Sequence, residues 1–163
     1  MNIFRESIPH PKLLQLYDYW DAIRDDRVMP GRRDMDPLDI PRLLPNIALF
    51  DVEHTPLRFR IRLYGTALTS NTGSDVTGRY LDEPGVSPIS LQTNLSNKKV
   101  TLTKTPHILE GLYPPGTGSN SGSHFYRLCL PLSDDGRQVS MLLVGCFREK
   151  HAIAEKQRRA AVA

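Results

Sequence analysis

The first apolar residues of the chain recur at spacings of three and four. This spacing places them on one face of an amphipathic helix, which we predict over residues 11–24. The side chains of this face are Leu13, Leu16, Tyr17, Trp20 and Ile23. The face packs either on its own domain or against a second subunit. Trp and Tyr suit both arrangements, because each ring buries a large area and keeps a polar atom for a partner.

Residues 28–46 contain four prolines, which exclude a long helix and a central strand. We therefore predict that residues 1–45 form the N-terminal helix and an ordered connector. The pattern changes to strands from residue 46 onward. In residues 58–63 apolar and basic side chains alternate, which places Phe59, Ile61 and Leu63 on the core face of a half-buried strand.

Short runs of the same kind predict five strands, over residues 47–52, 58–63, 107–113, 126–132 and 139–147. Between the second and third strands, recurrent glycines in residues 65–85 predict short helical turns. Residues 87–104 predict a longer helix with Leu91, Leu95 and Leu102 near one face. The order predicts an α+β fold with a five-stranded antiparallel sheet, inserted helices and an N-terminal amphipathic helix.

The dipeptide Asp135-Gly136 predicts a hairpin between the last two strands. A turn centred there gives a face that we predict to be the core face, formed by Tyr126, Leu128, Leu130, Leu132, Val139, Met141, Leu143 and Gly145. The opposite face holds Phe125, Cys129, Leu142, Val144 and Cys146. Both faces are apolar and need cover. The middle helices can cover one, and the N-terminal helix or a second subunit can cover the other.

Composition describes a single globular domain of 163 residues, 39% hydrophobic and 24% charged. The net charge of +3 lies in residues 148–163, which hold five basic and two acidic side chains. We predict that this segment is a basic tail, helical or disordered, and that the neutral body binds no nucleic acid. No apolar run reaches the ~18 residues of a membrane span, and no secretory signal is visible. A cytoplasmic location without membrane insertion is therefore expected.

Several stretches carry a family resemblance, namely residues 16–20 (LYDYW), 29–37 (MPGRRDMDP), 43–45 (LLP), 49–52 (LFDV), 59–66 (FRIRLYGT), 73–79 (GSDVTGR) and 128–136 (LCLPLSDDG). In this order they resemble the PAS domain, and more narrowly a family of small stand-alone bacterial PAS proteins. The resemblance covers residues 13 to 147, with a PAS core over 46–147. It implies a cavity between the sheet and the short helices, which is either a filled core or a ligand site.

The candidate lining residues of this cavity are Phe59, Ile61, Leu63, Leu91, Leu95, Tyr126, Leu128, Met141 and Leu143. The candidate contact residues for a partner are Leu13, Leu16, Tyr17, Trp20, Phe125, Leu142 and Val144. Haem sensors of the oxygen-sensing type in this family use a His on the longer middle helix, and residues 87–104 contain none. Flavin photosensors use a Cys in the short middle helices, where neither Cys129 nor Cys146 lies. Haem and flavin are therefore not expected, and any cofactor is unknown. The two cysteines form no CxxC pair, and no metal site is expected.

These features lead to a non-catalytic sensory or regulatory PAS module as the first hypothesis. It would bind a small ligand, form a homodimer, or dock onto a histidine kinase or another signalling protein. The alternative is a small enzyme on a curved-sheet α+β fold, such as an isomerase or hydratase. That alternative needs a pocket acid or base with a perturbed pKa, for which Glu110 and His107 are the candidates.

Overall fold

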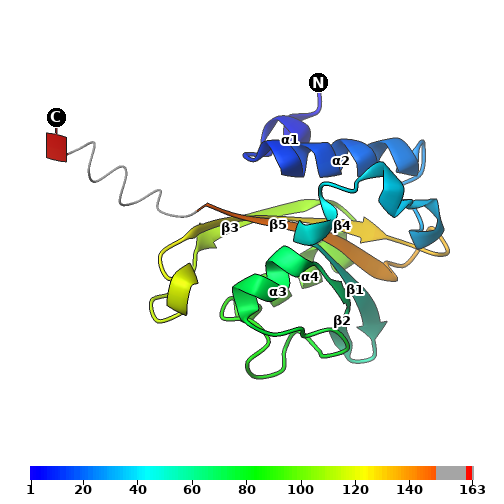
Figure 1. Ribbon diagram of the computed structural model, residues 1–163. Helices are drawn as coiled ribbons and strands as arrows, with labels where there is room; N and C mark the ends of the chain where they lie inside the picture. The colour runs from blue at the N-terminus through cyan, green and yellow to red at the C-terminus, as the bar shows by residue number, and fades with distance from the viewer. Residues whose placement is uncertain (150–160, 163) are drawn as a thin grey trace.

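The computed structural model describes residues 1–149 and 161–162, and its centre is a five-stranded sheet (Figure 1). All neighbouring strands are antiparallel, in the order β2-β1-β5-β4-β3. The strands are β1 (Ile47–His54), β2 (Leu57–Tyr64), β3 (His107–Leu112), β4 (His124–Leu132) and β5 (Met141–Glu149). The α+β fold with five antiparallel strands is confirmed.

Helices cover both faces of this sheet. Figure 1 shows α2 lying across one face, while α3 and α4 lie against the other. The helices are α1 (Ile3–Glu6), α2 (Pro11–Arg24), α3 (Thr66–Thr72) and α4 (Ser90–Thr103). Short 3-10 turns complete the chain, at η1 (Arg32–Asp34), η2 (Pro37–Asp39), η3 (Leu44–Asn46) and η4 (Gly118–Asn120).

Helix α2 begins where Pro11 supplies a helical φ and the ring of His10 accepts the backbone N–H of Lys12. Its apolar stripe is buried on its own domain, against Leu49, Leu128, Leu130 and Leu143 of the sheet, a surface that we call the α2 face. The indole Nε1 of Trp20 donates to the carbonyl oxygen of Pro131 at 2.9 Å. This packing excludes Leu13, Leu16, Tyr17 and Trp20 as contact residues for a partner, because all four are buried within the chain.

Gly145 of β5 allows the helix to lie this close. A Cβ atom at this position would lie 2.6 Å from Leu16 Cδ2 and 2.9 Å from Leu13 Cδ2. These distances are shorter than normal van der Waals contact, and both leucine side chains are fully buried. The absence of a side chain at position 145 thus fixes where α2 crosses the sheet.

The opposite surface of the sheet is the pocket face, formed by Ala48, Phe50, Ile61, Cys129, Leu142, Val144 and Cys146. Our prediction grouped the residues of β4 and β5 correctly by face, but it placed the wrong face toward the middle helices. Val139, which precedes β5, was also grouped with the wrong side chains, because it packs with the pocket-face residues. Tyr126, Leu128, Met141 and Leu143 belong to the α2 face. Phe125, Leu142 and Val144, predicted as an outer surface, are buried on the side of α3 and α4. Alternation identifies the residues that share a face, and here both faces are apolar.

The connection between β4 and β5 is wider than the predicted two-residue turn. Leu130 pairs with Leu143, whereas a turn centred on Asp135-Gly136 would pair it with Met141. The carboxylate of Asp135 accepts the backbone N–H groups of Arg137 and Gln138, which closes a longer loop. The shift is two residues, so the paired side chains of β4 and β5 keep their faces.

A bulge in β2 changes the face of Leu63. Ile61 pairs with Phe50, but Leu63 pairs with Leu49, which leaves Arg62 as an extra residue in β2. Strict alternation therefore ends at Ile61, and Leu63 turns away from the pocket face, with 41% of its surface exposed. Tyr64 takes its place on the pocket face, paired with Ala48.

The buried and exposed faces of helix α4 are the reverse of those that we predicted. It starts at Ser90, and Leu91 and Leu95 are 72% and 60% exposed. The buried face is polar and consists of Thr93, Ser96, Asn97 and Thr101, with Val100 the apolar exception. The buried face of α4 is polar because it covers the side chain of Arg127, which lies on the pocket face of β4.

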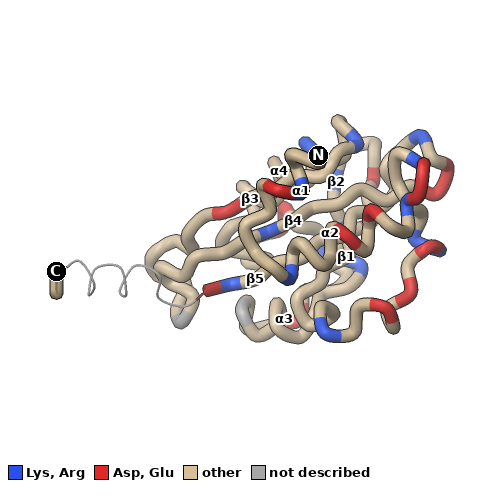
Figure 2. Tube along the Cα trace, turned by 90° about the horizontal axis from the view of Figure 1, so that it is seen from above, with Lys and Arg blue, Asp and Glu red and all other residues tan. Residues whose placement is uncertain are grey.

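Charged residues of both signs are interspersed along the described chain (Figure 2). Many exposed arginines face acidic residues, as in Arg58–Asp82 at 2.7 Å and Arg5–Asp18 at 2.7 Å. Residues 1–149 and 161–162 include no helix with the length and hydropathy needed to cross a bilayer. The predicted basic tail lies outside the described residues, apart from Arg148 and Glu149 at the end of β5 and Ala161 and Val162.

We expect Trp20→Phe to destabilise the fold by about 1–3 kcal/mol, because the buried carbonyl of Pro131 loses its donor. Denaturant unfolding of the purified variants measures the effect. Tyr17→Phe is the matched control on the same helix, since the hydroxyl of Tyr17 only accepts from the partly exposed Asn2. Equal losses in the two variants would show that the indole hydrogen bond does not hold α2 in place.

Candidate ligand pocket

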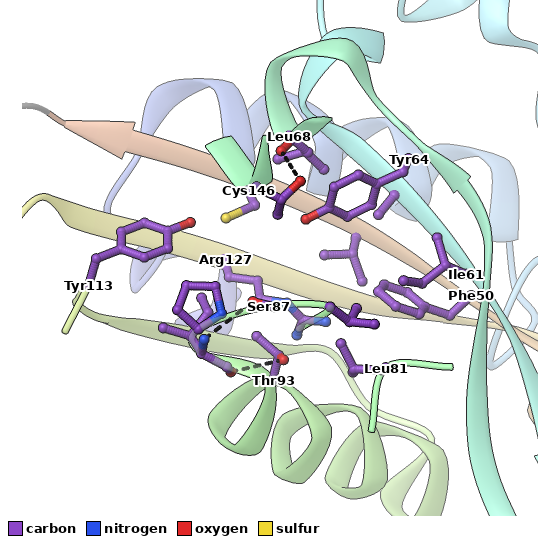
Figure 3. A pocket seen from close by; sticks show the side chains of 16 residues that line it. Phe50, Ile61, Tyr64, Leu68, Leu81, Ser87, Thr93, Tyr113, Arg127 and Cys146 are labelled. Carbon is purple, nitrogen blue, oxygen red and sulfur yellow. Dashed lines mark hydrogen bonds between the residues drawn. The ribbon is translucent and has the colours of Figure 1, made fainter. Parts of the chain in front are cut away.

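A cavity of about 50 Å³ lies between the pocket face of the sheet and the segments that contain α3 and α4. It is about a third of the size of the ~150 Å³ cavity that accepts benzene in a well-studied engineered protein. Figure 3 shows the side chains that surround it. They are Ala48, Phe50, Ile61, Tyr64, Leu68, Thr72, Leu81, Val86, Ser87, Pro88, Ile89, Thr93, Tyr113, Arg127, Val144 and Cys146.

Each wall of the pocket follows from the local structure. The segment between α3 and α4 pairs with β2, where Gly78 and Leu81 donate backbone N–H groups to Ile61 and Phe59. This pairing holds Leu81 and Val86 over the cavity. Gly65 permits the sharp entry into α3, because a Cβ atom there would lie 2.3 Å from the carbonyl oxygen of Pro45.

The polar floor of the pocket is Arg127, which is 3% exposed. Its guanidinium donates to Asn97 Oδ1 at 2.5 Å and to Ser96 Oγ at 3.3 Å, both on α4. Ser96 Oγ also lies 2.8 Å from Nδ1 of His107. The centre of the guanidinium is 6.0 Å from the ring centre of Phe50, within the range of a cation–π contact. These contacts connect β4 to α4.

Two phenols face the cavity from different elements, Tyr64 at the end of β2 and Tyr113 after β3 (Figure 3). Burial raises the pKa of Tyr64 to about 12 and also raises the pKa of Tyr113. Burial raises the pKa of the Cys146 thiol to about 11. All three groups are therefore protonated at neutral pH, and Cys146 lacks the thiolate that a nucleophile needs.

The predicted lining residues are divided among three places. Ile61 lines the pocket, and Phe59 is buried on the same face. Leu63 is displaced by the bulge, and Leu91 and Leu95 line an open groove on the outer side of α4 with Leu57 and Asp82. The remaining predictions, Tyr126, Leu128, Met141 and Leu143, are wrong as cavity positions because they lie beneath α2.

The sequence contained a signal for Arg127, a pocket residue that we did not predict. Arg127 is the charged residue in the otherwise apolar strand 126–132, and a buried strand with a single charge commonly marks a polar site. Tyr64 and Tyr113 had no comparable signal, because their positions depend on the bulge and on the loop after β3. No cluster of three or more potential metal ligands occurs within residues 1–149 and 161–162.

The sheet, its covering helices and this pocket define an α+β domain with a small cavity between the sheet and short helices. A family model for the PAS domain matches residues 8–146, and the chain therefore belongs to the PAS domain family. Comparison with curated proteins gives no match.

Several solved structures are similar to this chain, and the first of those named here supports the fold. The PAS domain of BvgS from Bordetella pertussis is 17% identical, with a TM-score of 0.51 over 78% of this chain and 96% of that chain. A domain of an HTR-like protein from Haloarcula marismortui is 13% identical, with a TM-score of 0.45 over 63% and 97%. A LOV protein of Rhodobacter sphaeroides is 12% identical, with a TM-score of 0.43 over 78% and 76%.

We expect the stability of the protein to fall as the pH rises from about 10 to about 12. An unfolded tyrosine ionises near pH 10, whereas Tyr64 in the native state ionises near pH 12, so unfolding releases a proton in this range. The stabilisation is complete below pH ~10 and is lost as the pH approaches the native pKa. Tyr64→Phe will make this decline shallower.

Denaturant unfolding across that pH range measures the effect, with Tyr17→Phe as the control on the other side of the sheet. If Tyr64→Phe and wild-type protein lose stability in parallel, Tyr64 does not ionise late.

Proposed function

We propose that this chain is a non-catalytic sensory or regulatory module that binds a small ligand in the pocket and signals through protein–protein contacts. The observation that carries the proposal is a partly open cavity in a PAS domain, lined by the buried cation of Arg127 and by two phenols. Filled cores place apolar side chains in such a space. A cavity that instead collects polar groups suits a ligand with matching polar atoms.

Helix α4 offers a route from the pocket to the surface. One face of α4 supplies Ser96 and Asn97 to Arg127. The other face exposes a stripe of leucines, Leu91, Leu95 and Leu102, which lie along one line at helical spacing. A ligand that draws Arg127 away from α4 would shift the helix, and the leucine stripe would move with it.

The partner that we propose is a second copy of the chain. The alternative is that the chain docks onto a histidine kinase or another signalling protein. The surfaces predicted from the sequence are buried, so the contact requires another surface. Exposed leucines in a row are uncommon on monomeric proteins and favour association. The expected cytoplasmic location is part of the proposal, and both cysteines are free thiols, as is usual in a reducing compartment.

The enzymatic alternative receives less support from the geometry. His107 and Glu110 do not line the pocket. Burial lowers the pKa of His107, which is hydrogen-bonded to Ser96. Glu110 lies on the edge strand β3, 3.5 Å from His124 of β4. Among the lining groups, Tyr64, Tyr113 and Cys146 have pKa values shifted away from neutrality, which does not suit general acid–base catalysis.

Filling the pocket will test the ligand-binding part of this proposal. Ala48→Leu adds three carbon atoms to the wall of a cavity of about 50 Å³ and is expected to abolish binding of small molecules. Nuclear magnetic resonance screening of a set of small acids, amides and alcohols detects binding through shifts of the pocket resonances. A wild-type protein that binds none of them, or a variant that binds as well as wild type, would contradict the proposal.

The mass of the protein in solution will test self-association. Light scattering of wild-type protein is expected to report a dimer at high concentration, and Leu91→Lys/Leu95→Lys is expected to shift it toward monomer. Leu38→Lys is the matched control, because Leu38 is an exposed leucine outside α4. A wild-type monomer at every concentration would exclude the homodimer and leave docking onto another protein as the form to pursue.

A further inference from the structure

We propose that the ligand of this pocket is a small carboxylate with a short hydrocarbon body, bound through the guanidinium of Arg127 and the hydroxyl groups of Tyr64 and Tyr113. This inference rests on the proposed function, since it names the chemical class that the same pocket would take. Three observations carry it, namely an unneutralised buried cation, an excess of hydrogen-bond donors and an apolar remainder of the wall.

The first observation is the isolation of Arg127 from negative charge. Several arginines at the surface of this protein are paired with acidic side chains, as Arg58 is with Asp82 and Arg60 with Glu53 at 3.2 Å. Arg127 is almost fully buried and has no acidic side chain within ion-pair distance in the described part of the chain. Burying a charge is costly unless an opposite charge offsets it. An anionic ligand supplies that charge.

The second observation is the shortage of acceptors around the guanidinium. It carries five N–H donors, and its protein acceptors are the neutral oxygens of Ser96 and Asn97. Asn97 Oδ1 also accepts from the thiol of Cys129, at 3.6 Å. The amide Nδ2 of Asn97 is buried without a hydrogen-bond partner among the described residues. The region around Arg127 is therefore rich in donors and poor in acceptors.

The phenols add two donors that face the same space. Both hydroxyl groups point into the pocket in Figure 3, and neither forms a hydrogen bond with the described residues. Both phenols are neutral at physiological pH, because burial raises their pKa values. A guanidinium and two hydroxyl groups match the acceptor sites of one carboxylate, which takes up to four hydrogen bonds.

The third observation restricts the rest of the ligand. The remaining wall is mostly aliphatic or aromatic, as at Phe50, Ile61, Leu81 and Val144. Inorganic phosphate or sulfate would turn unpaired oxygens toward these side chains, at a cost in desolvation. A carboxylate attached to a few carbon atoms places its oxygens at one end and its hydrocarbon against this wall. The volume of about 50 Å³ limits the body to a few carbons.

The contacts from Arg127 to Ser96 and Asn97 also fit a purely structural connection between β4 and α4. The two explanations differ in what they predict for charge selectivity. A structural arginine gives no preference between an acid and its amide, whereas a carboxylate site prefers the acid.

The test compares matched ligands on the full-length wild-type protein, by calorimetry and by resonance shifts. The probes are acetate, propionate and isobutyrate, each paired with its amide, together with inorganic phosphate. At least one acid is expected to bind about 10-fold or more tightly than its amide, since a hydrogen bond to a charged group is stronger than a neutral one. Preference for the amide, or tighter binding of phosphate than of every acid, would overturn the assignment.

Variants locate the site. Arg127→Gln is expected to weaken the preferred acid by about 10- to 100-fold, with little change in the amide. Tyr64→Phe/Tyr113→Phe keeps both rings and is expected to weaken the acid several-fold. The double phenylalanine variant decides the matter if Arg127→Gln does not fold. Arg58→Gln, a surface arginine away from the pocket, is the control and is expected to bind like wild type.

Failure of this inference is distinguishable from failure of the proposed function. If amides or other neutral molecules bind in the pocket and the acids do not, the carboxylate assignment is wrong and the ligand-binding module stands. If no probe shifts the pocket resonances and Ala48→Leu behaves like wild type, both are wrong. If Arg58→Gln weakens acid binding as much as Arg127→Gln does, the anion binds on the surface and the assigned site is wrong.

Discussion

Burial of both faces of a single antiparallel sheet is the constraint on which the rest of this structure depends. A sheet with one solvated face needs one layer of cover, but here Leu128 and Leu130 point to one side while Cys129 and Leu142 point to the other. The chain meets this need from its two separate helical segments. Helix α2 and the connector cover one face, and the segment from α3 to α4 covers the other. The pocket forms on the second side, where α3, α4 and the segment between them surround a space over the sheet.

Much of this architecture was predictable from the sequence. The strands and the two main helices have strong periodic signals, and the resemblance to the PAS domain followed from short stretches in a fixed order. What failed was the assignment of faces. Alternation groups Leu128 with Leu130 and Cys129 with Arg127, yet it does not say which group faces α4. Gly145 and Arg127 held that information, since one makes room for a helix and the other requires polar neighbours.

The candidate site was less predictable, because it depends on features that leave weak traces in a sequence. The outward leucines of α4 suggested a buried stripe, but Ser96 and Asn97 are buried instead, since Arg127 lies opposite them. Hydrophobic periodicity assumes an apolar core, and a helix that covers a buried cation breaks the assumption. A polar helix face opposite a charged strand residue was the relevant pattern, and it involves residues about thirty positions apart.

The bulge at Arg62 shows that the register of β2, as well as the identity of its side chains, decides which groups this pocket presents to a ligand. The extra residue turns the side chain of Leu63 away from the pocket face and brings the side chain of Tyr64 onto it. If the same residues of β2 paired with β1 without the bulge, Leu63 would lie opposite Ala48 on the pocket face and Tyr64 would lie opposite Ile47 on the α2 face. A shift in register near the end of β2 is therefore a change through which related chains could acquire pockets of different chemistry on an unchanged scaffold.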